Sequence, residues 1–77
     1  MTTPLQVKEL IAAGLSCDEL QVSGDGQHFE AFIVAEAFAG KSTLQQHRMV
    51  YAALGDKMHT AIHALSLRTL TPEQADG

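Results

Sequence analysis

The chain has 77 residues, of which 45% are hydrophobic, and its nine acidic and five basic residues give a formal net charge of −4. This length allows one domain, and the acidic balance argues against a general affinity for nucleic acid or an anionic membrane. Its one cysteine, Cys17, excludes an internal disulfide and favours a reducing compartment. We find neither a targeting segment nor an apolar run of the roughly 20 residues that span a bilayer. We therefore expect a cytoplasmic single domain over 1–77, with flexible ends at 1–3 and 75–77.

The first predicted elements are a helix and a β-hairpin. The helix begins at the capping box TPLQ (3–6) and closes at Gly14. Apolar and polar residues alternate over 20–22, as in a half-buried strand. SGDG (23–26) predicts a hairpin turn, because Asp-Gly accepts the positive φ angles of tight turns. The return strand, 28–36, has apolar residues on both faces, so we expect it to be the central strand.

A second capping box, STLQ (42–45), starts a long helix that ends near Gly55. Residues at spacings of three and four predict one stripe that faces the core: Leu44, His47, Val50, Tyr51 and Leu54. We expect a turn or a short extra helix over 56–60 and a third strand, IHALSLRT, over 62–69. TPEQ (71–74) opens a last helical turn by the same capping logic.

These elements predict an α+β domain of order α-β-β-α-(α)-β-(α), with one mixed three-stranded sheet and the helices packed on one face. The passage from the second strand through a helix to the third resembles a βαβ crossover. Such a crossover is right-handed if its two strands are parallel in one sheet.

The sequence GKST (40–43) looks like the end of a phosphate-binding loop. Such a loop needs G-x-x-x-x-G-K-[ST], so that glycine amides can approach phosphates closely. Here Ala35 stands where the first glycine is required, and Phe38 occupies a loop that should be small. We interpret Ser42 as a helix N-cap and Gly40 as the residue that turns the chain into the helix. We therefore expect no specific binding of ATP or GTP.

Four short sequences occur in order at characteristic separations: Phe38-x-Gly40, HRMVY (47–51), IHALS (62–66) and TPE (71–73). With the SGDGQHF hairpin, they make the chain resemble the BolA family over almost the whole domain. The hairpin is similar to that of the acid-stress-associated bacterial branch, the YrbA or IbaG type. The resemblance implies a type II KH-like fold, which agrees with the predicted element order.

The resemblance also implies a function in iron–sulfur cluster trafficking, iron homeostasis and stress response. BolA-like proteins form heterodimers with monothiol glutaredoxins and share a bridging [2Fe–2S] cluster with them. The BolA-side ligands carried over to this chain are His63 and His28. Two imidazoles can replace two thiolates on one iron, and the glutaredoxin cysteine and its glutathione would supply the rest. We expect no cofactor in the isolated chain. Formation of a weak homodimer is left as an alternative.

The other histidines and the cysteine have structural interpretations. His47 and Tyr51 lie in the predicted core stripe, so loss of the His47 side chain is expected to cost about 1–3 kcal/mol of stability. His59 is expected to be exposed. Cys17 is expected to behave as a small hydrophobic residue whose acidic neighbours oppose thiolate formation. If Cys17 or another group can substitute for His28, the loss of the His28 side chain should weaken the cluster spectrum less severely.

The alternative function is DNA-binding transcriptional regulation of the BolA type. Four residues could form a small basic face for it: Lys41, Arg48, Lys57 and Arg68. A KH module grips nucleic acid with a G-x-x-G loop, however, and the sequence contains none. Catalysis is not expected, because the sequence shows no paired carboxylates, nucleophile elbow or metal-hydrolase motif.

Overall fold

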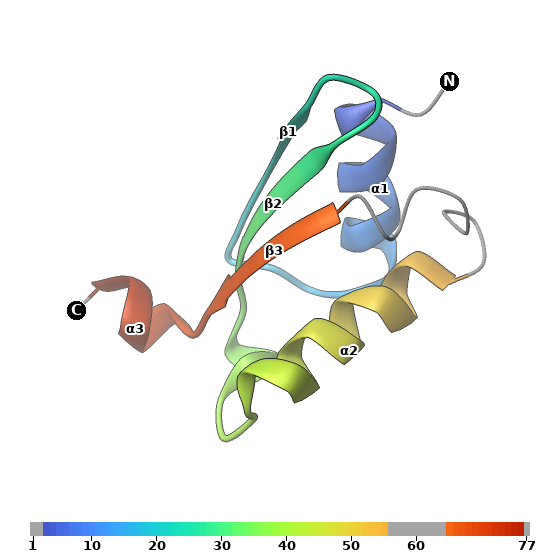
Figure 1. Cartoon of the computed structure of the whole chain (residues 1–77). Helices are drawn as coiled ribbons and strands as arrows, with labels where there is room; N and C mark the ends of the chain where they lie inside the picture. The colour runs from blue at the N-terminus through green and yellow to red at the C-terminus, as the bar shows by residue number, and fades with distance from the viewer. Residues whose placement is uncertain (1–2, 56–64, 77) are drawn as a thin grey trace.

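The computed structural model describes residues 3–55 and 65–76 (Figure 1). In chain order its elements are α1 (Pro4–Gly14), β1 (Glu19–Gly24), β2 (Phe29–Val34), the 3-10 helix η1 (Glu36–Phe38), α2 (Thr43–Leu54), β3 (Leu65–Leu70) and α3 (Pro72–Asp76). The predicted α+β fold is confirmed. The turn or short helix expected over 56–60 lies outside the described residues.

Each α-helix in the described residues begins at a predicted capping box. At α1 the Thr3 hydroxyl accepts a hydrogen bond from the Gln6 backbone N–H (3.2 Å), and the Gln6 side chain accepts one from the Thr3 N–H (2.9 Å). The same reciprocal pair joins Ser42 to Gln45 at α2, and residues 71 and 74 at α3. Each pair satisfies two N–H groups that the helix itself leaves unbonded, so the helix starts are fixed locally.

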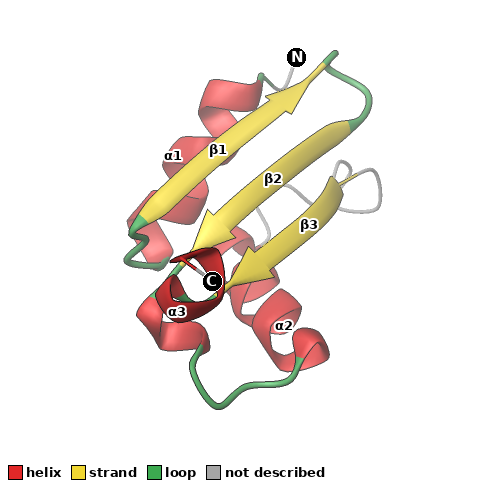
Figure 2. Cartoon of the chain, turned by 90° about the vertical axis from the view of Figure 1, so that its left-hand side faces the viewer, coloured by secondary structure: helices red, strands yellow, loops and turns green. Residues whose placement is uncertain are grey.

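The sheet has the order β1-β2-β3, with β2 in the centre as predicted. β1 runs antiparallel to β2 and pairs Gly24 with Phe29, whereas β2 runs parallel to β3 and pairs Phe29 with Leu65. Figure 2 shows the sheet in front, with α1 and α2 together behind one face. The short α3 follows β3 and lies on the other side of the sheet (Figures 1 and 2).

The core lies between the sheet and the two long helices. Its largest fully buried side chains are Val7, Ile11, Phe29, Ile33, Phe38, Val50 and Leu54. β2 ends at Val34, two residues before the expected end. The chain turns there through η1, in which the Phe38 N–H donates to the carbonyl oxygen of Ala35 (3.2 Å). This turn places the Phe38 ring in the core.

The expected core stripe of α2 is wrong at its first position, because Leu44 is 60% exposed. The buried face runs instead through Gln46, Val50 and Leu54, each four residues from the next. Leu44 precedes Gln46 by two positions, which is about 200° around the helix axis. His47 and Tyr51 are half-buried at the edge of this face.

Candidate functional site

His28 lies in the turn between β1 and β2, directly before the first residue of β2, and its side chain is exposed. The Asp25 carboxylate accepts hydrogen bonds from the backbone N–H groups of His28 and Gln27, both at 2.9 Å. These two bonds, that of His28 first, lower the pKa of the Asp25 carboxyl. The Asp25 N–H in turn donates to the His28 carbonyl oxygen (3.2 Å). The turn therefore fixes the backbone of His28 and leaves its imidazole in solvent.

Gly24 makes this turn possible. A side chain at Gly24 would collide with the carbonyl oxygen of His28 and would lie 2.7 Å from the ring of Phe29. Because neither group can move without disturbing β2, only glycine lets the turn sit this close to the start of the strand.

The second predicted ligand, His63, lies outside the described residues, as do His59 and Lys57. The described residue nearest to His63 in the sequence is Leu65, which begins β3 and pairs with Phe29. Since β2 and β3 are parallel, they begin at the same end of the sheet. In the sequence, His28 precedes β2 by one position and His63 precedes β3 by two.

Cys17 lies at the other end of the hairpin. The N–H of its neighbour Asp18 donates to the carbonyl oxygen of Val34 (2.7 Å), which is the last residue of β2. His28, by contrast, directly precedes the first residue of β2. Six strand residues separate these ends by about 17 Å. Cys17 therefore cannot substitute for His28, and that expectation is wrong.

The environment of Cys17 agrees with a structural role. The thiol donates a hydrogen bond to the carbonyl oxygen of Leu15 (3.3 Å) and packs against the core. Its pKa is raised, mainly by burial and further by the charge of Asp18. Within residues 3–55 and 65–76, no group of three or more His, Cys, Asp or Glu side chains could hold a metal ion. The described residues therefore contain no complete metal site of this kind.

The basic residues do not form one face. Lys41 and Arg48 are exposed at the entry of α2 and within it. Thr69 contacts Gln46 of α2 through its side chain, so its neighbour Arg68 points to the opposite face of the sheet, because strand side chains alternate. The prediction of a shared basic face is wrong for Arg68, and Lys57 lies outside the described residues.

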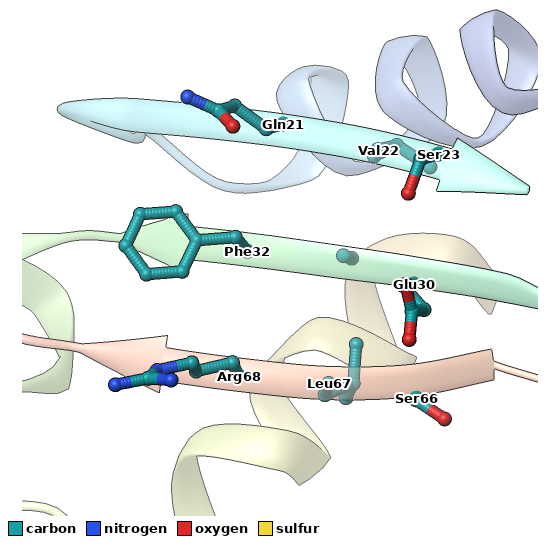
Figure 3. Close-up of a pocket in the computed structure, with 9 residues that line it drawn as sticks. Gln21, Val22, Ser23, Glu30, Phe32, Ser66, Leu67 and Arg68 are labelled. Carbon is teal, nitrogen blue, oxygen red and sulfur yellow. The ribbon is translucent and has the colours of Figure 1, made fainter.

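Arg68 instead lines a shallow depression of about 430 Å³ on the sheet face that α1 and α2 leave open (Figure 3). Its side chains form two cross-strand rows, Gln21–Phe32–Arg68 and Ser23–Glu30–Ser66. Figure 3 shows the Arg68 side chain extending away from Glu30. The sequence analysis did not identify this surface. The one sequence feature that could have indicated this surface is Phe32, an apolar residue on the same face of β2 as the polar Glu30.

GKST forms the entry to α2. Gly40 has φ 76°, a left-handed conformation that glycine adopts readily, and Ser42 is the N-cap of the helix. Both residues therefore have the structural roles that the sequence predicts, and the absence of nucleotide binding stays a prediction. In the part of the chain that the structure describes, no helix is long and apolar enough to cross a membrane.

Comparisons with known proteins agree with this architecture. A family model described as BolA-like protein matches residues 10–74. The chain is 34% identical over 70 residues to the acid stress protein IbaG of Escherichia coli (strain K12), an alignment that covers 90% of this chain and 83% of that protein. A solved structure of a bolA protein homologue from Coxiella burnetii has a TM-score of 0.84 and 45% sequence identity, with 100% of both chains covered.

A further relative differs in length. The chain is 36% identical over 55 residues to the DNA-binding transcriptional regulator BolA of Escherichia coli (strain K12). This alignment covers 71% of the chain and 52% of the regulator, so it spans about half the length of that relative. Together the comparisons confirm the resemblance that the hairpin and the HRMVY and IHALS sequences indicate.

Proposed function

The chain belongs to the BolA family, and on that premise we propose that it holds one iron of a [2Fe–2S] cluster that bridges it to a monothiol glutaredoxin. Its ligands are His28 and His63. The glutaredoxin cysteine and glutathione supply the thiolates of the other iron. The complex serves iron–sulfur cluster trafficking, iron homeostasis and stress response.

The pairing of Phe29 with Leu65 is the observation that carries this proposal. It brings the starts of β2 and β3 together at one end of the sheet. His28 is one residue from the first start, and His63 is two residues from the second, a stretch of chain that reaches at most about 7 Å. This register supports a shared site for two histidines that are 35 positions apart in the sequence.

The donor set fits half of a cluster site. A two-iron cluster takes four terminal ligands, and two imidazoles on one iron are a known substitute for two thiolates, which raises the cluster's reduction potential. The exposed side chain of His28 suits a cluster shared across an interface. Cys17 is half-buried at the far end of the hairpin, so the thiolates have to come from a partner.

Anaerobic reconstitution with iron, sulfide, glutathione and a monothiol glutaredoxin tests the proposal through visible absorption and circular dichroism. Wild type should give a spectrum that glutaredoxin alone does not give. His63→Ala should abolish it, and His28→Ala should weaken it. His47→Ala is the matched control, since this half-buried α2 histidine should affect stability and leave the spectrum intact. An unchanged spectrum with His63→Ala would refute the proposal.

DNA-binding transcriptional regulation is the second candidate, and the name of the regulator from Escherichia coli favours it. The placement of the basic residues weighs against it, because Arg68 lies on the sheet face opposite α2. Titration with duplex DNA at several salt concentrations separates the two functions. Phosphate contacts give a steep loss of affinity with salt, and we expect no such binding at physiological ionic strength.

A further inference from the structure

The open face of the sheet carries a cation, an anion and an aromatic ring next to one another. Arg68 and Glu30 are exposed, and Phe32 is half-buried. Phe32 pairs with Arg68 across the strands and lies two positions from Glu30 along β2. Figure 3 shows the three side chains on one surface, with Arg68 extending away from Glu30. The two opposite charges therefore do not satisfy each other within one copy of the chain.

The Phe32 ring belongs to this surface and not to the core. Its neighbours in β2, Ala31 and Ile33, are buried in the core, and successive side chains of a strand point to opposite faces. Phe32 thus places a large apolar group on the face that α1 and α2 leave open. Contact with another apolar surface would remove this ring from water, which is favourable.

The arrangement is complementary to itself. Arg68 and Glu30 lie on neighbouring strands, two positions out of register, so their Cα atoms are about 8 Å apart. If a second copy is laid face to face, a two-fold axis parallel to the sheet and midway between these residues exchanges their positions. Each Arg68 then faces Glu30 of the other copy, and this pair occurs twice. Phe32 lies about equally far from both residues and hence near the axis, where it meets its own copy.

We propose that this open sheet face is a self-association surface and that its partner is a second copy of the chain. The surface is formed by Gln21, Ser23, Glu30, Phe32, Ser66 and Arg68. Two charge pairs fix the relative orientation of the copies, and one aromatic contact lies between them. The inference goes beyond the proposed function and does not depend on it, because it uses no histidine and no cluster.

The small size of the face makes this dimer weak. Three strands of six residues each cover about 14 by 20 Å. A standard interface takes roughly 800 Å² from each partner, so this one belongs to the transient class. Each copy also has a net charge of −4, and like net charges repel. We expect a dissociation constant of about 0.1–1 mM.

Single-stranded nucleic acid fits the same face less well. A base could stack on Phe32 while Arg68 contacts a phosphate. The Glu30 carboxylate is exposed beside them, however, and it would repel the phosphates. A second copy uses both charges of the face, whereas nucleic acid uses only one.

Sedimentation equilibrium of the isolated chain tests the surface, at concentrations that extend above the expected dissociation constant. Wild type should show a monomer–dimer equilibrium without iron, glutathione or glutaredoxin. Arg68→Glu and Glu30→Arg should each weaken self-association about tenfold or more, because each brings like charges together twice. Phe32→Ser should weaken it as well, since it removes the apolar contact. Circular dichroism verifies that each variant is folded.

The two charge reversals should complement each other. A mixture of Arg68→Glu and Glu30→Arg should form a heterodimer, and the double variant Arg68→Glu/Glu30→Arg should self-associate within about threefold of wild type. If net charge alone governed association, the less acidic Glu30→Arg would instead associate more tightly than wild type. Arg48→Glu on α2 and Glu9→Arg on α1 are matched controls at exposed positions. Both should stay within about twofold of wild type.

The inference is overturned if wild type stays monomeric, if either charge reversal associates as wild type does, or if neither the mixture nor the double variant recovers association. Equal losses in the α1 and α2 controls would also overturn it, because another surface would then join the copies. A monomeric wild type whose Phe32 and Arg68 NMR signals shift on addition of single-stranded oligothymidylate would assign the face to nucleic acid instead.

Discussion

The hydroxyl of Thr69, in β3, donates a 2.6 Å hydrogen bond to the side-chain amide oxygen of Gln46, in α2. The amide nitrogen of Gln46 donates to the carbonyl oxygens of Phe38 and Lys41. One buried side chain thus joins a helix, the turn before it and the sheet, and it satisfies three polar groups of other residues.

Gln46→Leu should destabilise the fold, because it leaves these three groups without their partner. We expect the free energy of unfolding to fall by about 2–4 kcal/mol, measured by urea denaturation. Thr69→Val removes one donor and should cost about 1–2 kcal/mol. The exposed Gln27→Ala is the control and should stay within about 0.5 kcal/mol of wild type. A wild-type midpoint for Gln46→Leu would contradict the proposed linking role.

The sequence predicted helix starts better than helix faces, for a physical reason. A capping box such as that of Ser42 and Gln45 is made by residues three positions apart, so the local sequence contains all of it. The buried face of α2 is decided elsewhere. Gln46 faces inward because Phe38, Lys41 and Thr69 offer it hydrogen bonds, and these partners meet only in the folded chain.

The same distinction separates the parts of the candidate site. The turn that fixes His28 is local, and the Asp-Gly pair at 25–26 indicated it. The sheet face on which Arg68 lies depends on which residues of β3 point toward the helices. The expected span 62–69 did not determine this, whereas the register of β3 with β2 does. The distance of Cys17 from His28 depends on the pairing of β1 with β2, and the hairpin predicted around residues 23–26 already implied it.

Gly14→Ala should destabilise the chain although alanine is the better helix former. A Cβ at Gly14 would lie 2.9 Å from both Cα and Cβ of Ala53, so α1 and α2 would have to separate. We expect a net loss of about 1–2 kcal/mol after the gain of up to about 1 kcal/mol in helix propensity. In thermal unfolding, adding Ala53→Gly should recover part of the loss. Stabilisation by Gly14→Ala alone would show that the helices adapt without cost.

The Cys17 thiol should resist alkylation up to alkaline pH. Burial and the charge of Asp18 raise its pKa above the ordinary value of 9.0. The thiolate therefore forms at a higher pH in the native chain than in the unfolded chain. The protonated Cys17 thiol therefore contributes to the stability of the native state below pH 9.0. This contribution is lost as the pH rises through the raised pKa of the native thiol. Iodoacetamide rates followed by mass spectrometry should show a higher midpoint for the native chain than for the chain in guanidinium chloride. Equal midpoints would contradict the effect of burial.

The turn at Asp25 should persist in acid to below pH 3.8. The backbone N–H groups of His28 and Gln27 lower the pKa of this carboxyl from its ordinary value of 3.8. The bonds to the carboxylate are therefore intact above pH 3.8 and are lost as the pH falls through the lowered value. The amide proton shifts of His28 and Gln27 should move together there in an NMR titration. Asp25→Asn, which keeps an acceptor and cannot titrate, should show no such step.

Asp25 should also act on the proposed cluster site through His28. Asp25→Ala removes both hydrogen bonds of the turn and loosens the residue that carries the imidazole. Ordering a more mobile ligand costs more conformational entropy when the cluster binds. The heterodimer spectrum should therefore weaken at equal iron loading, although less than with His28→Ala. Asp25→Asn should restore most of it. Because Asp25 works through His28, the double variant Asp25→Ala/His28→Ala should be no weaker than His28→Ala. Additive losses would mean that Asp25 acts on the complex by a route that does not involve His28.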